Sequence, residues 1–310
     1  MSLVRGALLA GSRSRWLRER ASRYPFVRRS VSRFMPGEEL DDALSAARAL
    51  AAEGIPTILT RLGENLTDVE AASEVTRHYL DAFDRVAESG LDAQISIKPT
   101  QLGLDQDPEA CFRNLKALVS RAEERGNCVW IDMEDSSYVD RTLDLYRRAR
   151  AESSRVGVCL QAYLRRTPND LDALLPLGPA IRLVKGAYME PPEVAIPRKA
   201  DVDQAFYDLA TRFLTPRRDQ PRGFLGIATH DPSLLARLAS FVAANSVPRE
   251  SHELEMLYGI QRGLQSRMVA EGRRLRVLIS YGEYWFPWYM RRLAERPANV
   301  LFVVKSLLAR

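Results

Sequence analysis

The feature that most constrains the fold is a series of eight apolar runs of strand length, separated for the most part by helix-like segments. The runs are nearly continuously apolar and do not alternate, as expected for parallel strands that are buried on both faces. They cover residues 57–62, Ala93–Pro99, Cys128–Glu134, Val156–Tyr163, Ala180–Lys185, Phe224–Thr229, Glu253–Leu257 and Arg276–Ser280. This order predicts an α/β fold, a distorted (β/α)8 barrel of the TIM type with an N-terminal helical appendage.

Helical periodicity fills most of the intervals between the runs. The predicted helices cover Glu38–Glu53, Pro108–Arg125, Tyr138–Glu152, Pro168–Leu175, Ala205–Leu214, Ser233–Ala244 and Tyr258–Gly272, with a long helix through Leu80 and Val86. A doubly wound open sheet is the alternative, but no Gly-x-Gly-x-x-Gly follows the first run. We find no repeat and no low-complexity linker, and therefore predict a barrel over residues 54–310 preceded by a helical segment over residues 1–53.

The N-terminal segment carries the basic charge of the chain. Residues 1–35 contain nine arginines and one acidic residue, Glu19, whereas the whole chain has a formal net charge of +5. The remainder is therefore slightly acidic, which argues against nucleic-acid binding by the fold itself. A mitochondrial transit peptide has a similar composition. Apolar residues such as Trp16 and Phe34 favour folded amphipathic helices, broken near Tyr24–Pro25, or a segment that contacts a membrane surface.

Cysteine usage and hydropathy indicate the cellular setting. The three cysteines, Cys111, Cys128 and Cys159, are scattered and form no Cys-x-x-Cys pair, so they predict neither a disulfide framework nor a metal site. No apolar run reaches the roughly 18 residues that a membrane-spanning helix needs. We therefore expect a cytoplasmic protein, with peripheral contact at the inner face of the membrane through residues 1–35.

Charged residues stand at the carboxyl ends of several predicted strands, where barrel enzymes place their reacting groups. A buried charge without a partner is costly, so isolated charges in apolar runs imply either ion pairs or a shared cavity. We favour one polar cavity, with scattered structural ion pairs as the alternative. It would gather Lys98, Asp132, Glu134, Arg182, Lys185 and His230. The excess of cations predicts an anionic ligand, or a ligand with a carboxylate and a phosphate-bearing cofactor.

The last predicted strand leads into a segment rich in aromatic and charged residues, Ser280–Pro297. It has five aromatic residues between Tyr284 and Tyr289, and Pro287 suits the first position of a helix. Helical spacing then places Trp288, Arg291, Arg292 and Glu295 on one side. Two guanidinium groups beside aromatic walls can grip a carboxylate. The alternative is a surface helix whose charges pair with one another.

These residues belong to ordered blocks that resemble the proline dehydrogenase family, from about residue 50 to the C-terminus. The most specific blocks are Arg182-Leu-Val-Lys-Gly-Ala-Tyr188 and the tandem arginines. Supporting blocks are Ser96–Leu104, Ile131–Asp135, Gln161–Tyr163, Ala228–His230 and Glu255–Gly259. The resemblance implies a distorted barrel that holds FAD, and the bacterial single-function members are similar in length and in their basic N-terminal part.

The resemblance also implies a reaction. The family oxidises L-proline to Δ1-pyrroline-5-carboxylate, the first step of proline catabolism to glutamate, with a hydride passing to the flavin and electrons to a membrane quinone. A downstream partner would be the pyrroline-5-carboxylate (glutamate semialdehyde) dehydrogenase. An alternative is oxidation of a related cyclic imino acid such as hydroxyproline. A Schiff-base aldolase that uses Lys98 or Lys185 is an alternative from another class.

Site roles are carried over from the resemblance. The catalytic residues would be Asp132 and Arg182, the latter near flavin N5. The substrate would meet Lys98, Arg291 and Arg292 at its carboxylate, Tyr188, Leu257 and Leu278 at its ring, and Glu295 as a gate paired with Arg291. FAD would be held by Met133, Gln161, Arg182, Val184, Lys185, Gly186, Ala187, Tyr188, Thr229 and His230.

Two positions depart from the family's usual residues. Leu278 stands where a tyrosine is frequent, and Met189 stands where a tryptophan is frequent. The tyrosine normally lines the substrate ring and disfavours hydroxylated proline, so Leu278 bears on which imino acid is preferred. Met189 is expected to pack on a flavin face through its polarizable sulfur.

Overall fold

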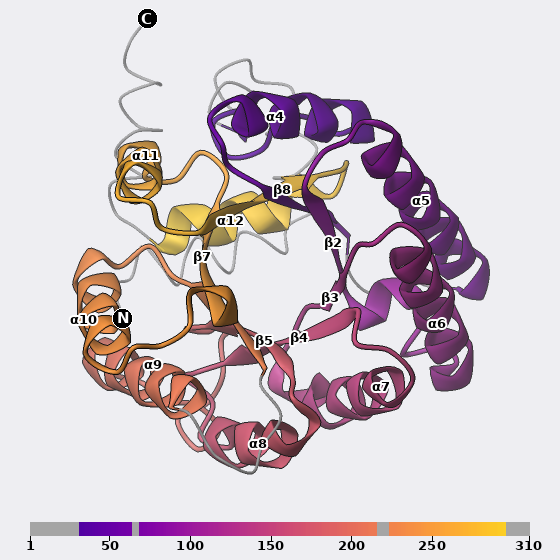
Figure 1. The fold of residues 1–310 in the computed structure, drawn as a ribbon. Helices are drawn as coiled ribbons and strands as arrows, with labels where there is room; N and C mark the ends of the chain where they lie inside the picture. Colours follow the sequence, from indigo (N-terminus) through magenta and orange to yellow (C-terminus); the bar gives the residue numbers. More distant parts are fainter. Residues whose placement is uncertain (1–30, 64–67, 216–222, 296–310) are drawn as a thin grey trace, which may run out of the picture.

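The computed structural model describes residues 31–63, 68–215 and 223–295, with side chains described as far as Met290. Eight parallel strands form a closed barrel in which each strand pairs with its neighbours in sequence and β8 closes on β1 (Figure 1). The strands are β1 Thr57–Arg61, β2 Ala93–Ile97, β3 Val129–Ile131, β4 Val156–Gln161, β5 Ala180–Val184, β6 Phe224–Ala228, β7 His252–Leu257 and β8 Leu275–Tyr281. The predicted barrel is confirmed, and each of the eight predicted runs overlaps one strand.

Helices surround the barrel and alternate with the strands. They are α4 Leu40–Ala52, α5 Val69–Glu88, α6 Pro108–Glu124, α7 Val139–Glu152, α8 Thr167–Leu174, α9 Lys199–Leu214, α10 Pro232–Ala244, α11 Arg262–Ala270 and α12 Trp285–Glu295. Aspartates cap α5, α6 and α10, where the carboxylates of Asp68, Asp107 and Asp231 accept backbone N–H bonds. Such caps satisfy donors that have no partner inside the helix.

Three predicted helix boundaries were wrong. The helix predicted over Tyr258–Gly272 begins only at Arg262, because Gln261 before it has a left-handed backbone with φ of 52°. The helix predicted from Ala205 already begins at Lys199. The last helix begins at Trp285, so Pro287 is its third residue and not its first. Pro287 still lies in the first turn, where a missing N–H costs no helical hydrogen bond.

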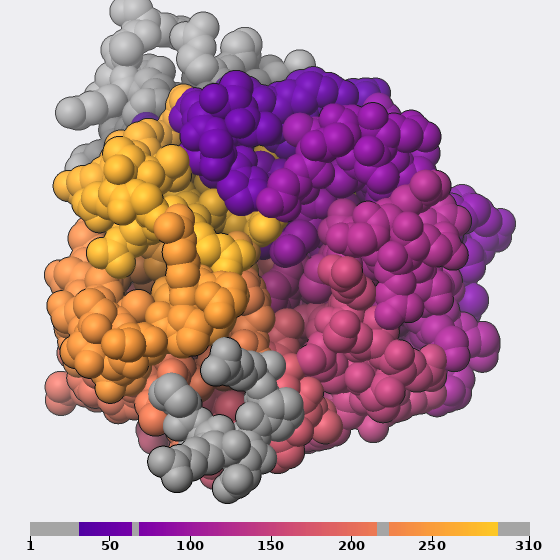
Figure 2. Space-filling model, viewed as in Figure 1, coloured from indigo at the N-terminus to yellow at the C-terminus, as the bar shows by residue number. Residues whose placement is uncertain are grey.

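The helix after β8 does not join the outer ring. In Figure 1, α12 lies inside the ring of outer helices, and its residue Trp288 lines a cavity formed by the carboxyl ends of the strands. The position between α11 and α5 is taken by α4, which packs against β8 and β1. Figure 2 shows this indigo N-terminal part against the yellow C-terminal part. The barrel is therefore distorted in a way that places a helix at the carboxyl ends of its strands.

An apolar cluster separate from the main barrel core attaches α12 to the rest of the molecule. Its buried members are Val31, Phe34, Met35, Leu62, Ile260, Trp285, Phe286, Trp288 and Tyr289. Trp285 also donates its indole N–H to Glu38 at 3.0 Å. Of the helical segment predicted over residues 1–53, residues 1–30 lie outside the described part, and residues 31–35 pack on α12. Within the described ranges, no helix has the length and apolarity required to cross a membrane.

Candidate active site

A cavity of about 420 Å³ opens at the carboxyl ends of the strands. This volume is in the range of small-molecule and cofactor sites. Apart from Glu134 and Met189, it is lined by the predicted site residues whose side chains are described: Lys98, Asp132, Met133, Gln161, Arg182, Val184, Lys185, Gly186, Ala187, Tyr188, Thr229, His230, Leu257 and Leu278. The structure therefore brings together residues that are far apart in the sequence. Arg291, Arg292 and Glu295 belong to α12, but their side chains lie outside the described part.

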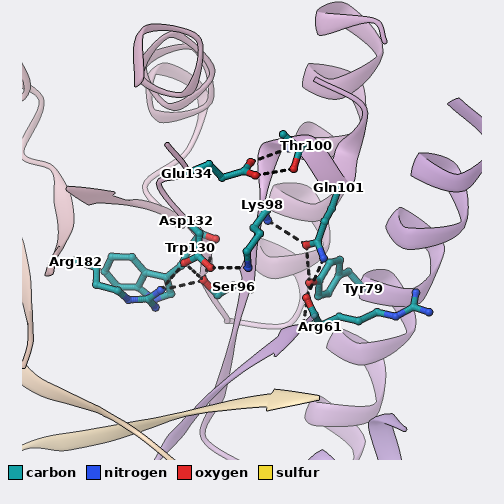
Figure 3. Close-up of polar contacts among 10 residues, drawn as sticks. All are labelled: Arg61, Tyr79, Ser96, Lys98, Thr100, Gln101, Trp130, Asp132, Glu134 and Arg182. Atoms are coloured by element: carbon teal, nitrogen blue, oxygen red, sulfur yellow. Dashed lines mark hydrogen bonds and ion pairs between the residues drawn. The ribbon is translucent and has the colours of Figure 1, made fainter. Parts of the chain in front are cut away.

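Arg182 is the centre of the polar network on the cavity floor. Its Nη1 donates to Asp132 Oδ1 at 3.0 Å and to Ser96 Oγ at 2.9 Å, as Figure 3 shows. Its guanidinium lies 4.7 Å from the centre of the Trp130 ring. Burial lowers the pKa of Arg182, but the charges of Glu255 and Asp132 raise it above its ordinary value. The floor of the cavity thus holds a permanent cation in a fixed orientation.

Lys98 approaches the same carboxylate from β2. Its Nζ lies 3.4 Å from Asp132 Oδ2, and its backbone N–H donates to Gln101 Oε1 at 3.3 Å. Gln101 in turn donates to the Arg61 carbonyl and accepts from the Tyr79 hydroxyl (Figure 3). These bonds fix the chain where it leaves β2. Asp132 therefore holds two cations, Lys98 and Arg182, at a defined separation.

Glu134, which the sequence placed in the same cavity, was predicted wrongly. Its carboxylate accepts from the backbone N–H of Thr100 at 3.0 Å and from the Thr100 hydroxyl at 2.7 Å (Figure 3). It is buried and does not line the cavity. The reason is that β3 ends at Ile131, so the chain after it no longer alternates as a strand does. Glu134 instead supports the short turn that follows β2.

The rim of the cavity beyond β5 carries a cluster of two lysines and two aspartates. Lys185 bonds to Asp203 and, at 3.0 Å, to Asp231, and Lys199 lies 3.3 Å from Asp231. Burial raises the pKa of Asp231, but the hydrogen bond and charge of Lys185 lower it to about 2. The two aspartates balance the charge of the lysines, but the lysine N–H groups remain donors of the kind that binds a phosphate.

Gly186, next to Lys185, allows the chain to pass close to an aromatic ring. Its φ is 119°, and a Cβ at this position would lie 2.1 Å from the Tyr163 ring. Only glycine fits here, because both the backbone conformation and the space exclude a side chain. The backbone of residues 186 and 187 can therefore reach the cavity directly. Met189, expected to face the same site, is 61% exposed and does not line the cavity.

An apolar wall completes the cavity on the side of β7 and β8. Leu257 and Leu278 are partners in the register of these two strands. His230 Nε2 accepts the backbone N–H of Leu257 at 2.9 Å. A neutral His230 must therefore carry its proton on Nδ1. This arrangement joins the end of β6 to the apolar wall.

Several residues that line the cavity were not predicted from the sequence. They are Thr60, Leu62, Cys159, Lys199, Ala228, Asp231, Glu255, Met256 and Ser280. Glu255 could have been predicted, because it lies two residues after Glu253 in a strand. The two side chains therefore point to the same face of the sheet. Lys199 and Asp231 lie outside the strands, and nothing in their local sequence indicates that they meet. Cys159 is buried, and burial raises the pKa of its thiol to about 12, so it stays neutral.

Comparisons with known proteins show the family to which the chain belongs. The family model described as "Proline dehydrogenase" matches residues 43–305. The chain is 35% identical to proline dehydrogenase 1 of Bacillus subtilis over 306 residues, which are 99% of each chain. It is 36% identical to the proline dehydrogenase of Deinococcus radiodurans over 283 residues, which are 90% of each chain.

A solved structure shows the same fold. Proline utilization A (PutA) from Bdellovibrio bacteriovorus, inactivated by N-propargylglycine, superposes with a TM-score of 0.80 at 23% sequence identity. The match covers 87% of this chain and 33% of that longer protein, so this chain corresponds to about one third of it. The family match over most of the chain and the two full-length relatives lead to one conclusion: this chain is an enzyme of the proline dehydrogenase family.

Proposed function

We propose that this chain oxidises L-proline to Δ1-pyrroline-5-carboxylate with FAD as its cofactor and passes the electrons to a membrane quinone. The observation that carries the proposal is the network of Arg182, Asp132 and Lys98 beside the apolar wall of Leu257 and Leu278. Such a site offers cationic side chains in fixed positions at one side and an apolar surface at the other. A small cyclic amino acid needs both, for its carboxylate and for its ring.

The residues of the cavity fit FAD. Gln161 Oε1 and Arg182 Nη2 are buried polar atoms without a hydrogen-bond partner among the described residues, and both residues line the cavity. A flavin ring has a polar edge that can satisfy such atoms, and Lys185 and Lys199 at the rim suit a pyrophosphate. The remaining contacts proposed for FAD are those of Met133, Val184, Gly186, Ala187, Tyr188, Thr229 and His230. When bound, FAD would accept the two electrons of the substrate.

The protein itself positions the substrate and supplies the electric field. Lys98, with Arg291 and Arg292 from α12, would bind the carboxylate of proline. Leu257, Leu278 and Tyr188 would pack against its ring and exclude water. Orientation of this kind is worth several kcal/mol of the barrier. Glu295 would pair with Arg291 over the bound substrate. We prefer this function to that of a Schiff-base aldolase, because the relatives are proline dehydrogenases.

Arg182 and Asp132 would act together at the cofactor. Arg182 is held cationic in a buried position, where a charge acts more strongly than it does in water. Asp132 fixes the orientation of both Arg182 and Lys98. A permanent cation here would stabilise negative charge on the flavin as electrons arrive. Residues 1–35 would hold this cytoplasmic enzyme at the membrane beside its quinone, and a pyrroline-5-carboxylate dehydrogenase would consume the product.

The proposal predicts a visible change on mixing with substrate. The purified protein should be yellow with a flavin spectrum, and L-proline should bleach it in the absence of oxygen. Glycine is the control, because it has the carboxylate and the amine but no ring, and it should leave the spectrum unchanged. A colourless protein that takes up no FAD, or a yellow protein that L-proline does not bleach, would overturn the proposal.

A second prediction concerns the choice of imino acid. Leu278→Tyr should raise the preference for proline over 4-hydroxyproline by roughly tenfold in kcat/KM, because added bulk and a hydroxyl change the wall that faces the ring. Leu278→Phe is the matched control that adds the ring without the hydroxyl. If both variants keep the ratio of the parent enzyme, Leu278 does not face the substrate.

A further inference from the structure

Glu255 is a buried carboxylate in the cavity to which the proposed reaction gives no role. It lies on β7 and is only 3% exposed. Its Oε2 accepts from Arg182 Nε at 2.6 Å. Its other oxygen, Oε1, is buried and has no hydrogen-bond partner among the described residues. Burying a carboxylate with only one of its oxygens hydrogen-bonded costs folding free energy. This cost suggests that Glu255 has a role in the site.

The neighbouring strand makes room for this carboxyl group. A Cβ at Gly226 of β6 would lie 2.1 Å from Glu255 Oε1, far closer than any side chain allows. Glycine at position 226 therefore permits the close approach of Oε1 to the strand. The carboxyl group is held by Arg182 on one side and by β6 on the other. Its position is thus fixed without a second hydrogen bond.

Charges of both signs surround Glu255. They are Arg182 from β5, Glu253 from its own strand and Arg276 from β8, with Asp132 of the β3 end and Lys98 of the β2 end beyond Arg182. Burial raises the pKa of Glu255, and the like charge of Glu253 adds to this effect, while Arg182 opposes it. The cavity floor contains two cations, Arg182 and Lys98, and two carboxylates, Asp132 and Glu255. It therefore has no net charge when all four groups are ionised. It has a net charge of one positive unit when Glu255 is neutral.

We propose that Glu255 is a positioning residue for Arg182 which takes up one proton on Oε1 when the bound flavin is reduced, and releases it on reoxidation. The inference rests on the flavin-dependent function proposed above. Reduction by proline delivers two electrons and one proton, which leaves one negative charge on the flavin. A proton drawn from solvent onto Oε1 neutralises Glu255, and the net positive charge of the floor then balances that charge. Oε2 keeps its bond from Arg182 throughout.

The test is the pH dependence of the midpoint potential of the bound flavin. Glu255→Gln keeps an oxygen that can accept from Arg182 Nε but cannot change its charge. Near neutral pH, the parent enzyme should take up one more proton per two electrons than this variant. That difference corresponds to a tenfold change in the reduction equilibrium per pH unit, about 30 mV for a two-electron couple. Equal proton counts across the pH range would overturn the proposal.

A matched control variant shows whether the effect is specific to Glu255, and a second measurement covers the case in which Glu255→Gln does not fold. Glu109→Gln removes an exposed carboxylate that also pairs with an arginine, Arg148, and should behave like the parent. If Glu255→Gln fails to fold or to bind FAD, the proposal can be tested on the parent enzyme by infrared difference spectra between its oxidised and reduced states. A neutral-carboxyl band should grow on reduction, and its absence would refute proton uptake. A protein that never binds flavin would refute both proposals, whereas normal bleaching without the extra proton refutes this one alone.

Discussion

Replacing Arg182 by methionine is expected to lower the free energy of unfolding by about 3–5 kcal/mol and the turnover with proline by roughly 100-fold or more. The stability loss arises because the buried Glu255 would lose its cation, and the half-buried Asp132 would keep only Lys98. The loss of turnover follows because no other described side chain donates to both carboxylates from this position. Denaturant titration and steady-state kinetics measure the two effects.

The stability loss should depend on pH with a definite sign. Burial raises the pKa of Glu255 in the folded state, so its contribution is fully present below the unfolded pKa and is lost as pH rises through the folded pKa. Without Arg182 that folded pKa rises further. Arg182→Met should therefore be least damaging at acidic pH and most damaging near neutral pH. Adding Glu255→Gln should recover part of the neutral-pH loss, since it removes one uncompensated charge.

A control separates this effect from the general loss of an arginine. Arg148→Met removes an exposed guanidinium that pairs with Glu109 on the surface. Exposed pairs are screened by solvent, so this variant should unfold close to the parent at every pH. If Arg182→Met unfolds at the same denaturant concentration as Arg148→Met, Arg182 does not hold the buried carboxylates in place.

The barrel and most of its cavity could be predicted from sequence because both depend on local patterns. Continuous apolar runs mark strands buried on both faces, and a charge such as Arg182 inside such a run must find a partner. In a parallel barrel all carboxyl ends meet at one side, so Lys98 and Arg182 had to converge once eight strands were recognised.

The errors arose where position depends on contacts between distant segments. Glu134 turns to Thr100 because a short turn after β2 presents its N–H there, which no pattern around Glu134 reveals. The rim cluster joins Lys199, the first residue of α9, to Asp231, the cap of α10. The place of α12 was equally hidden, because a helix after the last strand normally joins the outer ring. Its aromatic residues are buried against residues 31–35, Leu62 and Ile260, and Trp288 also lines the cavity.

The position of α12 beside the cavity implies a role for its two arginines in binding the substrate. Trp288 lines the cavity, and positions 291 and 292 follow it by three and four residues in the same helix. Residues at that spacing share one side of a helix. We therefore expect Arg291→Lys or Arg292→Lys to raise KM for proline by roughly 100-fold, because lysine cannot reproduce the two parallel bonds of a guanidinium to a carboxylate.

The pattern of kinetic changes identifies the cause. A carboxylate contact that is equally strong in the bound substrate and in the transition state changes KM and leaves kcat near the parent value. The flavin spectrum should also be unchanged, since neither residue is proposed to hold FAD. Arg262→Lys is the control, because Arg262 is an exposed arginine at the start of α11. Parent-like KM values in both tandem variants would remove Arg291 and Arg292 from the substrate site, and Lys98 would then be the only cation proposed for the carboxylate.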